Sequence, residues 1–404
     1  MAELPVGTPL PIDGKIRNPD VSTGFSAYVH IPFCTVRCGY CDFNTYTNPN
    51  FGLGAGRADY ADSVLKEIEL SRQVLSAKTE PGPLKSVFFG GGTPTLLEPE
   101  QLTKILTALR DTFGFVPNVE ITTEANPETV TLQKLAQLQL AGVNRVSFGM
   151  QSSVPHVLQT LDRLHTPGQV ARAANWAKEL GLNFSLDLIY GTPGESDADW
   201  NDSVRSAIAL EPNHISCYAL TIEPGTKMGT DLAHGKIAAP DEDAFARRYE
   251  LADELLTAGG YRWYEVSNWA RSGFECVHNL YYWRNANWWG YGPGAHSHLN
   301  GTRFWNVKHP LAYAQKLATN PIQTPAFGHE DLNQTERVEE AIMLGIRLRE
   351  GIAIPEMTSA ETVAQLIFDR LIDPAAALRE KRLVLTVRGR LLADAVIRQL
   401  WMDL

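Results

Sequence analysis

Short apolar runs alternate with amphipathic stretches from Ser26 to about Gly225. The runs are rich in β-branched and aromatic residues, which favours strands near 28–31, 86–89, 119–122, 145–148, 184–187 and 215–218. Between them, apolar residues recur at spacings of three and four, which predicts helices over 60–75, 99–113, 132–141, 168–180 and 197–210. This alternation predicts a parallel α/β sheet, either barrel-like or doubly wound. In both architectures ligands bind at the carboxyl ends of the strands.

The pattern changes after about Thr226. Residues 261–305 hold six of the nine tryptophans and five of the thirteen tyrosines. Beyond Asn333 the pattern predicts a helix over 336–348, a small hairpin at 383–386 and a last helix over 391–401. We therefore expect an N-terminal tail at 1–20, a core at 21–230 and an aromatic-rich connecting region at 231–330. A small helical, winged-helix-like C-terminal domain is expected at 331–404.

Composition and charge narrow the possible partners. The chain has 404 residues, 44% hydrophobic and 20% charged, which is a globular composition. Its net charge of −10 gives no long-range attraction for nucleic acid, so we interpret the basic residues near 379–390 as a solvated surface and expect no nucleic-acid partner. No run approaches about 18 apolar residues, so no integral membrane segment is predicted. The first 20 residues lack the apolar segment of a signal peptide.

The cysteines indicate a metal centre. Five cysteines are too few for a disulfide scaffold, which favours a reducing, cytoplasmic location. Cys34, Cys38 and Cys41 lie in the loop after the first strand, and no fourth Cys or His follows closely enough to complete a zinc site. Three thiolates suit three irons of a [4Fe-4S] cluster and leave the fourth iron open. Cys217 and Cys276 are expected to be free buried thiols.

Other strand ends carry candidate binding residues. The second strand is followed by GGGTP at 90–94, where glycines let the backbone approach a ligand closely. A tight structural turn explains the glycines equally well. Glu124 follows the third strand, and a carboxylate there is a natural acceptor for ammonium or ribose hydroxyl groups.

The CxxxCxxC spacing resembles the signature of the radical S-adenosylmethionine (SAM) enzymes. In that family the amino and carboxylate groups of SAM chelate the open iron of the cluster. The resemblance implies an incomplete parallel (β/α)6 barrel whose open top holds SAM and a [4Fe-4S] cluster bound by Cys34, Cys38 and Cys41. It places Tyr40 at the adenine and Arg163 at the SAM carboxylate. The full set of implied SAM contacts is Tyr28, Tyr40, Gly91, Gly92, Thr93, Glu124, Gln151, Arg163, Asp187 and Ala219.

Longer sequence motifs narrow the resemblance to one branch of the radical SAM enzymes. YVHIPFC at 28–34, DLIYGTPG at 187–194 and GPGAHS at 292–297 are similar to the oxygen-independent coproporphyrinogen III dehydrogenases and their relatives. The dehydrogenases usually carry CxxxCxxCxC, whereas this chain has Phe43 at the last position. They also carry an N-terminal extension, whereas 33 residues precede Cys34 here. Radical oxidation of a porphyrinogen is therefore the second hypothesis.

The leading hypothesis comes from a second group in that branch, the heme chaperones of the HemW type. These lack the fourth cysteine and carry HNxxYW, and this chain has HNLYYW at 278–283. A neutral imidazole can ligate heme iron, and Tyr and Trp offer flat faces to a macrocycle. We predict that His278, Tyr282 and Trp283 contact heme and that the heme passes to an unidentified acceptor protein. Two alternatives stay open: His278 ligates iron or only anchors the loop, and His296 and His298 are rival ligands.

Overall fold

The predicted strands form the middle of one twelve-stranded sheet. The computed structural model describes residues 7–77 and 79–403. Six neighbouring strands run parallel in sequence order, which is the order of a (β/α) barrel rather than of a doubly wound sheet. They are β1 (Phe25–Ile31), β2 (Leu84–Gly91), β3 (Phe115–Ala125), β4 (Arg145–Gln151), β5 (Asn183–Tyr190) and β6 (His214–Ala219).

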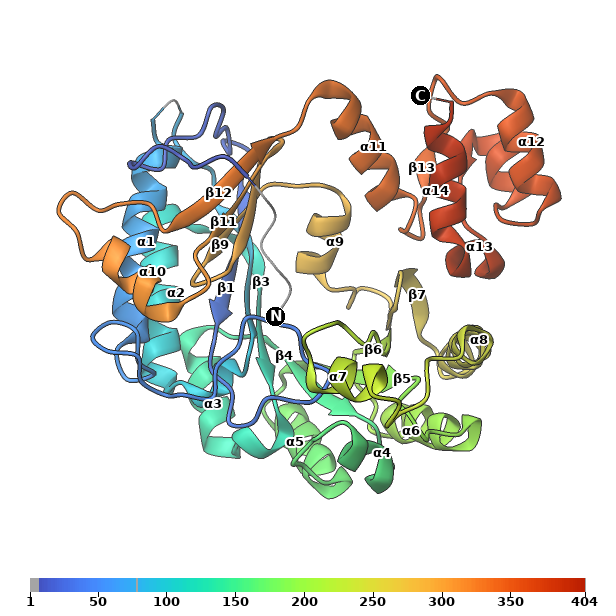
Figure 1. Cartoon of the computed structure of the whole chain (residues 1–404), viewed down its shortest axis with the longest axis horizontal. Coiled ribbons are helices and arrows are strands. Elements are labelled where there is room, and N and C mark those ends of the chain that lie inside the picture. The colour runs from blue at the N-terminus through green and yellow to red at the C-terminus, as the bar shows by residue number, and fades with distance from the viewer. Residues whose placement is uncertain (1–6, 78, 404) are drawn as a thin grey trace.

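Helices cover the outer side of this parallel part (Figure 1). The five predicted helices are present, with bounds within one residue of those expected. They are α1 (Tyr60–Leu75), α2 (Pro99–Phe113), α3 (Leu132–Ala141), α5 (Pro167–Glu179) and α6 (Asp197–Ala209). In α2, a proline at the first position and Gly114 after the last mark the ends, and Leu102, Ile105 and Leu109 are fully buried at helical spacing. Shorter helices are η1 (Pro94–Leu96), η2 (Pro127–Thr129) and α4 (Pro155–Thr160).

Much of the aromatic-rich region belongs to the sheet. β9 (Trp288–Tyr291) pairs in parallel with β1, and β10 (His296–Leu299), β11 (Thr302–Asn306) and β12 (Ala326–Asp331) continue outward. Four of the six tryptophans there are buried: Trp263, Trp269, Trp289 and Trp305. The density of tryptophan therefore reflects the packing of the sheet edges as well as any ligand.

The other edge carries β8 (Asn268–Ala270), antiparallel to β6, and then β7 (Arg262–Glu265). α7 (Lys227–Ala233) and α8 (Glu242–Ala258) precede this edge, and α10 (Pro310–Leu317) packs on α1. The short helix α9 (Val277–Trp283) connects β8 to β9, so it lies between the two arms of the sheet (Figure 1). This helix carries the HNxxYW segment.

The C-terminal region has a hydrophobic cluster of its own, which includes Ile346, Leu366 and Val396. It contains α11 (Gln334–Gly345), β13 (Ile352–Ala353), α12 (Ala360–Phe368), η3 (Ala376–Glu380), β14 (Arg382–Leu383), α13 (Val387–Leu391) and α14 (Ala393–Trp401). The predicted hairpin at 383–386 is different in the structure, because β14 pairs with the distant β13. The domain boundaries given above stay a prediction.

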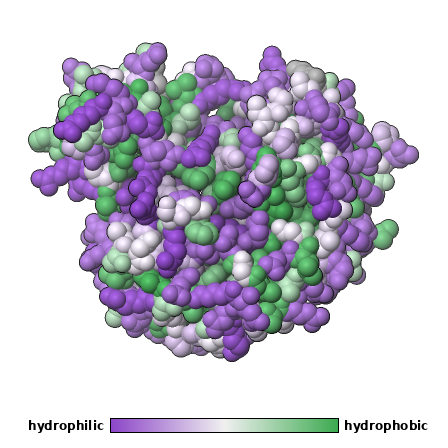
Figure 2. Space-filling view, turned by 180° about the vertical axis from the view of Figure 1, so that it is seen from behind, coloured by the Kyte–Doolittle hydropathy of each residue, from purple (hydrophilic) through white to green (hydrophobic). Residues whose placement is uncertain are grey.

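On the face shown in Figure 2, hydrophilic residues are widely spread and apolar residues lie among them. Within the described ranges, no helix combines the length and the apolar character needed to cross a bilayer.

Candidate functional site

The carboxyl ends of the parallel strands surround a cavity of about 580 Å³. Ligands are expected at this end of a parallel barrel. Of the sixteen residues singled out from the sequence, twelve line this cavity: Cys34, Cys38, Tyr40, Cys41, Gly91, Gly92, Thr93, Glu124, Gln151, Arg163, Asp187 and Ala219. The structure thus brings together residues that are up to 185 positions apart in the chain.

The three cysteines lie on one wall of the cavity. The Thr93 hydroxyl donates to the Cys34 sulfur at 3.9 Å, and Arg163 donates to the Cys38 sulfur at 3.7 Å. Among the described residues, no three side chains converge on a single ion. Each thiolate of a [4Fe-4S] cluster binds a different iron, so such convergence is not required. Burial raises the pKa of the Cys34 thiol to about 11, and metal binding offsets this because a coordinated thiol is deprotonated.

Arg163 supplies the positive charge beside these thiols. Its Nη2 donates to Asn126 Oδ1 at 2.6 Å and to the Gly149 carbonyl at 3.0 Å. Nearby, Gln151 ends β4 with φ of 61°, and its buried Oε1 has no hydrogen-bond partner among the described residues. A buried guanidinium of this kind can bind a carboxylate strongly.

Two carboxyl groups face the same space from β3 and β5. Glu124 accepts a hydrogen bond from the Gly91 amide at 3.0 Å. Burial, and then the charge of Asp187, raise the pKa of Glu124 to about 8. Asp187 accepts from the hydroxyls of Ser147 at 2.8 Å and Ser216 at 2.7 Å, and burial raises its pKa. These oxygens can accept hydrogen bonds from ammonium or hydroxyl groups of a ligand.

The glycines after β2 allow a close approach of neighbouring chain segments. Gly91 has φ of 105°, and a Cβ there would lie 2.4 Å from the His30 ring. A Cβ on Gly92 would lie 2.5 Å from the Phe33 carbonyl oxygen. Packing alone therefore requires both glycines, whether or not the backbone also binds a ligand.

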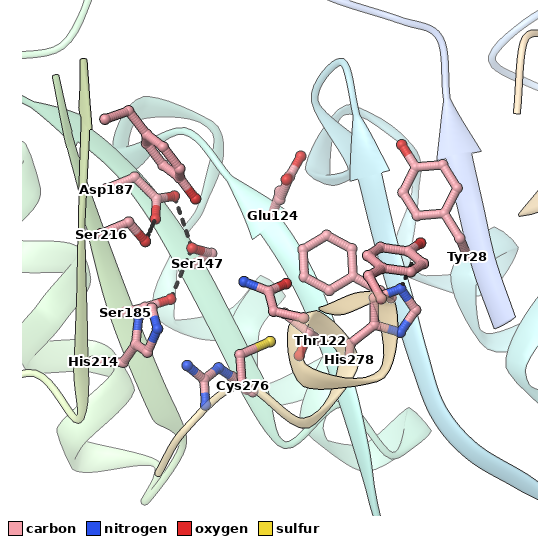
Figure 3. A pocket seen from close by; sticks show the side chains of 15 residues that line it. Tyr28, Thr122, Glu124, Ser147, Ser185, Asp187, His214, Ser216, Cys276 and His278 are labelled. Atoms are coloured by element: carbon pink, nitrogen blue, oxygen red, sulfur yellow. Dashed lines mark hydrogen bonds between the residues drawn. The ribbon is translucent and has the colours of Figure 1, made fainter. Parts of the chain in front are cut away.

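A second cavity, of about 200 Å³, lies inside the barrel (Figure 3). It shares Glu124, Ser147, Asp187 and Tyr218 with the larger cavity. Tyr28, His278 and Tyr282 line it, whereas Trp283 lines neither of the two cavities. The HNxxYW segment is thus adjacent to the predicted SAM site.

The HNxxYW side chains bond to the surrounding protein. His278 is 1% exposed, with Nδ1 2.8 Å from Ser86 Oγ and Nε2 2.9 Å from the Tyr282 hydroxyl. Burial lowers its pKa to about 3, which keeps the imidazole neutral. Trp283 and Asn279 both hydrogen-bond to the buried Glu265, whose pKa burial raises to about 7. These contacts anchor α9 in the structure.

Comparison with known proteins decides the family. The model of the radical SAM superfamily matches residues 28–207. The heme chaperone HemW of Mycobacterium tuberculosis H37Rv is 47% identical over 93% of this chain and 94% of its own length. HemW of Bacillus subtilis is 34% identical over 92% and 97%, and HemW of Escherichia coli K12 is 34% identical over 87% and 90%. The chain belongs to the HemW family of radical SAM proteins.

As a HemW-family member, the chain also resembles a solved relative in fold. The coproporphyrinogen III oxidase HemN of Escherichia coli, a radical SAM enzyme, superposes with a TM-score of 0.77 over 94% of this chain and 89% of its own. The two are 22% identical in sequence, so this likeness concerns the fold alone. It supports the incomplete barrel with its helical C-terminal region.

Membership in the radical SAM superfamily implies a [4Fe-4S] cluster chelated by SAM, and the cavity residues of this HemW-family chain fit both groups. Three thiols, a buried guanidinium and an unpartnered Gln151 oxygen provide the matching donors and acceptors. In radical SAM chemistry the cluster supplies an electron to SAM. The chain's own contribution is to orient the ligand: Arg163 offers N–H donors, and Glu124 offers a carboxyl group to the same cavity.

Several site residues of this HemW-family chain were not predicted from the sequence. Asn126 accepts a hydrogen bond from Arg163 and donates one to Thr93. The only signal for Asn126 in the sequence is its position two residues after Glu124. Ser86 contacts His278, and Glu120 accepts from the amides of Val277 and His278. Both lie inside strands and carry no local motif.

Proposed function

We propose that this protein is a heme chaperone, which binds heme and transfers it to an acceptor protein. The observation that carries the proposal is the 47% identity over 93% of the chain to a protein named heme chaperone HemW. Phe43, at the position of the extra cysteine of the dehydrogenases, also favours this function over porphyrinogen oxidation. The SAM-chelated cluster is then a structural or regulatory element. We further propose a cytoplasmic location, where cysteines stay reduced.

The proposed cluster ligands are Cys34, Cys38 and Cys41. The proposed SAM contacts are Tyr28 and the nine other predicted residues, which line the larger cavity: Tyr40, Gly91, Gly92, Thr93, Glu124, Gln151, Arg163, Asp187 and Ala219. The proposed heme segment comprises His278, Tyr282 and Trp283 on α9. His278 and Tyr282 line the smaller cavity, which shares residues with the SAM cavity. This supports the assignment, because a ligand bound beside them would lie close to SAM and the cluster.

One experiment separates the chaperone from an enzyme. Anaerobically reconstituted protein is divided into two samples. One sample is titrated with heme and followed by its Soret band, and the other receives SAM, a reductant and coproporphyrinogen III and is assayed for protoporphyrinogen. We expect stoichiometric heme binding without turnover. Turnover without tight heme binding would overturn the proposal and assign the protein to porphyrin oxidation.

A further inference from the structure

The segment after the three cysteines folds back beside the end of β1. The Cys34 amide donates to the Tyr46 carbonyl at 2.9 Å, and the Tyr46 amide donates to the Pro32 carbonyl at 2.7 Å. Thr45 therefore lies next to the residues that carry the first cysteine. Its side chain is buried, with 3% exposure, whereas Phe43 two residues earlier is 57% exposed.

The buried hydroxyl of Thr45 lacks an ordinary hydrogen-bond partner. Among the described residues, none provides its Oγ1 with a hydrogen bond of full geometry. The polar groups beside it are the thiols of Cys34 and Cys41: burial raises the pKa of each thiol, and the Thr45 hydroxyl opposes this rise. A neutral thiol is a weak acceptor, but a thiolate bound to iron is charged and accepts a proton donor more strongly. A buried hydroxyl without a partner is costly, so its place beside two cluster ligands requires an explanation.

The other cysteine sulfurs also have donors beside them. The Thr93 hydroxyl accepts from Asn126 at 3.2 Å, so its own proton can point to the Cys34 sulfur at 3.9 Å. Arg163 donates to the Cys38 sulfur at 3.7 Å. With Thr45 beside Cys34 and Cys41, each of the three sulfurs has a donor close to it.

We propose that the Thr45 hydroxyl donates a hydrogen bond to the cluster thiolate of Cys34 or Cys41 and thereby raises the reduction potential of the cluster. Hydrogen bonds to the sulfurs are among the factors that set this potential. Reduction adds one negative charge to the cluster and its ligands, so a donor stabilises the reduced form more than the oxidised form. Thr45 lines neither cavity and acts through the cysteines, as a positioning residue of the cluster. The inference rests on the proposed cluster ligands and not on heme binding.

A higher reduction potential makes the reduced cluster a weaker reductant. In radical SAM chemistry the cluster transfers one electron to SAM, and a weaker reductant disfavours this transfer. The donors beside the three sulfurs thus favour a cluster that keeps its electron. This agrees with the structural or regulatory role proposed above.

Thr45→Val keeps the branched shape of the side chain and removes the hydroxyl. We expect the ratio of reduced to oxidised cluster at a fixed potential to fall about tenfold, toward the lower end for a hydrogen bond to a charged group. For a one-electron couple this is a shift of about 59 mV to lower potential. Thr45→Ser keeps the hydroxyl, so we expect its reduction potential to stay near that of the wild type.

The test is a redox titration of the anaerobically reconstituted full chain without SAM. Dithionite is the reductant, and the electron paramagnetic resonance of the reduced cluster is the readout. An iron assay on the same samples measures how much cluster each variant holds. Thr192→Val is the matched control, because Thr192 is also buried and its hydroxyl also lacks a partner among the described residues. Thr192 lines neither cavity, so we expect the wild-type reduction potential.

Each other outcome overturns the inference. An unchanged potential in Thr45→Val at full iron content excludes the hydrogen bond as a source of tuning. An equal shift in Thr45→Ser assigns the effect to the methyl group, and an equal shift in Thr192→Val assigns it to general loosening of the fold. Thr45→Ala repeats the comparison without added bulk if Thr45→Val loses iron, and loss of iron from both makes the hydroxyl a requirement for cluster assembly instead. A wild-type chain that binds no iron overturns the proposed cluster ligands themselves.

Discussion

At the scale of single residues, Arg163 links the elements of the larger cavity. Its guanidinium reaches Cys38 of the cysteine loop, Asn126 after β3 and the Gly149 carbonyl of β4. A planar guanidinium with five N–H donors can form hydrogen bonds with these three acceptors at the same time, whereas the smaller ammonium group of lysine cannot. Arg163 therefore both organises the cavity and presents charge to it.

We expect Arg163→Lys to weaken SAM binding about tenfold, because a charged hydrogen bond of this kind contributes about 1.5–3 kcal/mol. Iron content should stay near that of the wild type, since the three cysteines are unchanged. Equilibrium binding of SAM and an iron assay on the same reconstituted sample measure the two effects. A variant with full SAM affinity would show that Arg163 acts only within the protein.

At the scale of elements, Glu120 on β3 ties α9 to the sheet. It accepts from the amides of Val277 and His278 and pairs with Arg145 at 3.5 Å. Arg145 is 4% exposed, so removal of its partner leaves a buried charge.

We expect Glu120→Gln to loosen α9, at a cost on the order of 2 kcal/mol, because it weakens the contacts with the helix amides and the buried ion pair. Hydrogen exchange at residues 276–284 should become at least tenfold faster. Glu350→Gln is the control, since its pair with Arg284 is exposed and contributes little. Equal exchange in Glu120→Gln and the wild type would show that other contacts hold the helix.

Local pattern was sufficient for the elements of the core but not for their distant partners. The bounds of α2 could be read from the sequence because proline, glycine and apolar spacing all lie within that segment. The pairing of Trp288 in β9 with Ser26 in β1 could not be predicted from the sequence, because it joins residues 262 positions apart. The same holds for the hairpin expected at 383–386, whose strand pairs with Ile352 and Ala353.

In the candidate site, too, local motifs could be predicted from the sequence and contacts between distant segments could not. Cys34, Cys38 and Cys41 share one loop, so their spacing indicated a cluster directly. Ser86 and Glu120 act on α9 from other strands, and no local signal marks a serine or a glutamate inside a strand. The contacts around His278 therefore became visible only in three dimensions.

At the scale of the whole molecule, several carboxyl groups are buried, and within the described part of the chain only Glu195 among those named below pairs with a buried cation, Arg248 at 3.3 Å. Burial raises the pKa of Glu67, Glu195 and Glu265 to about 7 and, with Asp187 beside it, that of Glu124 to about 8. The unfolded chain releases these protons near the ordinary value of 4.5. The folded protein therefore holds protons near neutral pH that the unfolded chain has already lost.

Buried histidines have the opposite effect at lower pH. Burial lowers the pKa of His30 and His165 to about 4 and that of His278 to about 3. Below pH 6.5, the ordinary pKa of histidine, these rings bind protons in the unfolded chain but not in the folded state, which destabilises the fold. Over the first pH unit above that value the unfolded histidines lose their remaining protons, which gives a small rise of stability, about 0.4 kcal/mol for each histidine. The carboxyl groups give the larger and opposite change.

We expect the free energy of unfolding to fall as the pH rises from 6.5 to 8.5, because the buried carboxyl groups lose protons in the folded state over this range, and this exceeds the smaller opposite effect of the histidines in the unfolded chain. For a pKa of about 7, one carboxyl contributes about 1 kcal/mol to this fall. Urea unfolding of the reconstituted protein at both pH values measures it. Glu67→Gln should reduce the fall by that amount, whatever it does to stability at a single pH. Glu69→Gln, an exposed neighbour on α1, should leave the fall unchanged. Stability that rises over this range would mean that the buried carboxyl groups are already ionised at neutral pH.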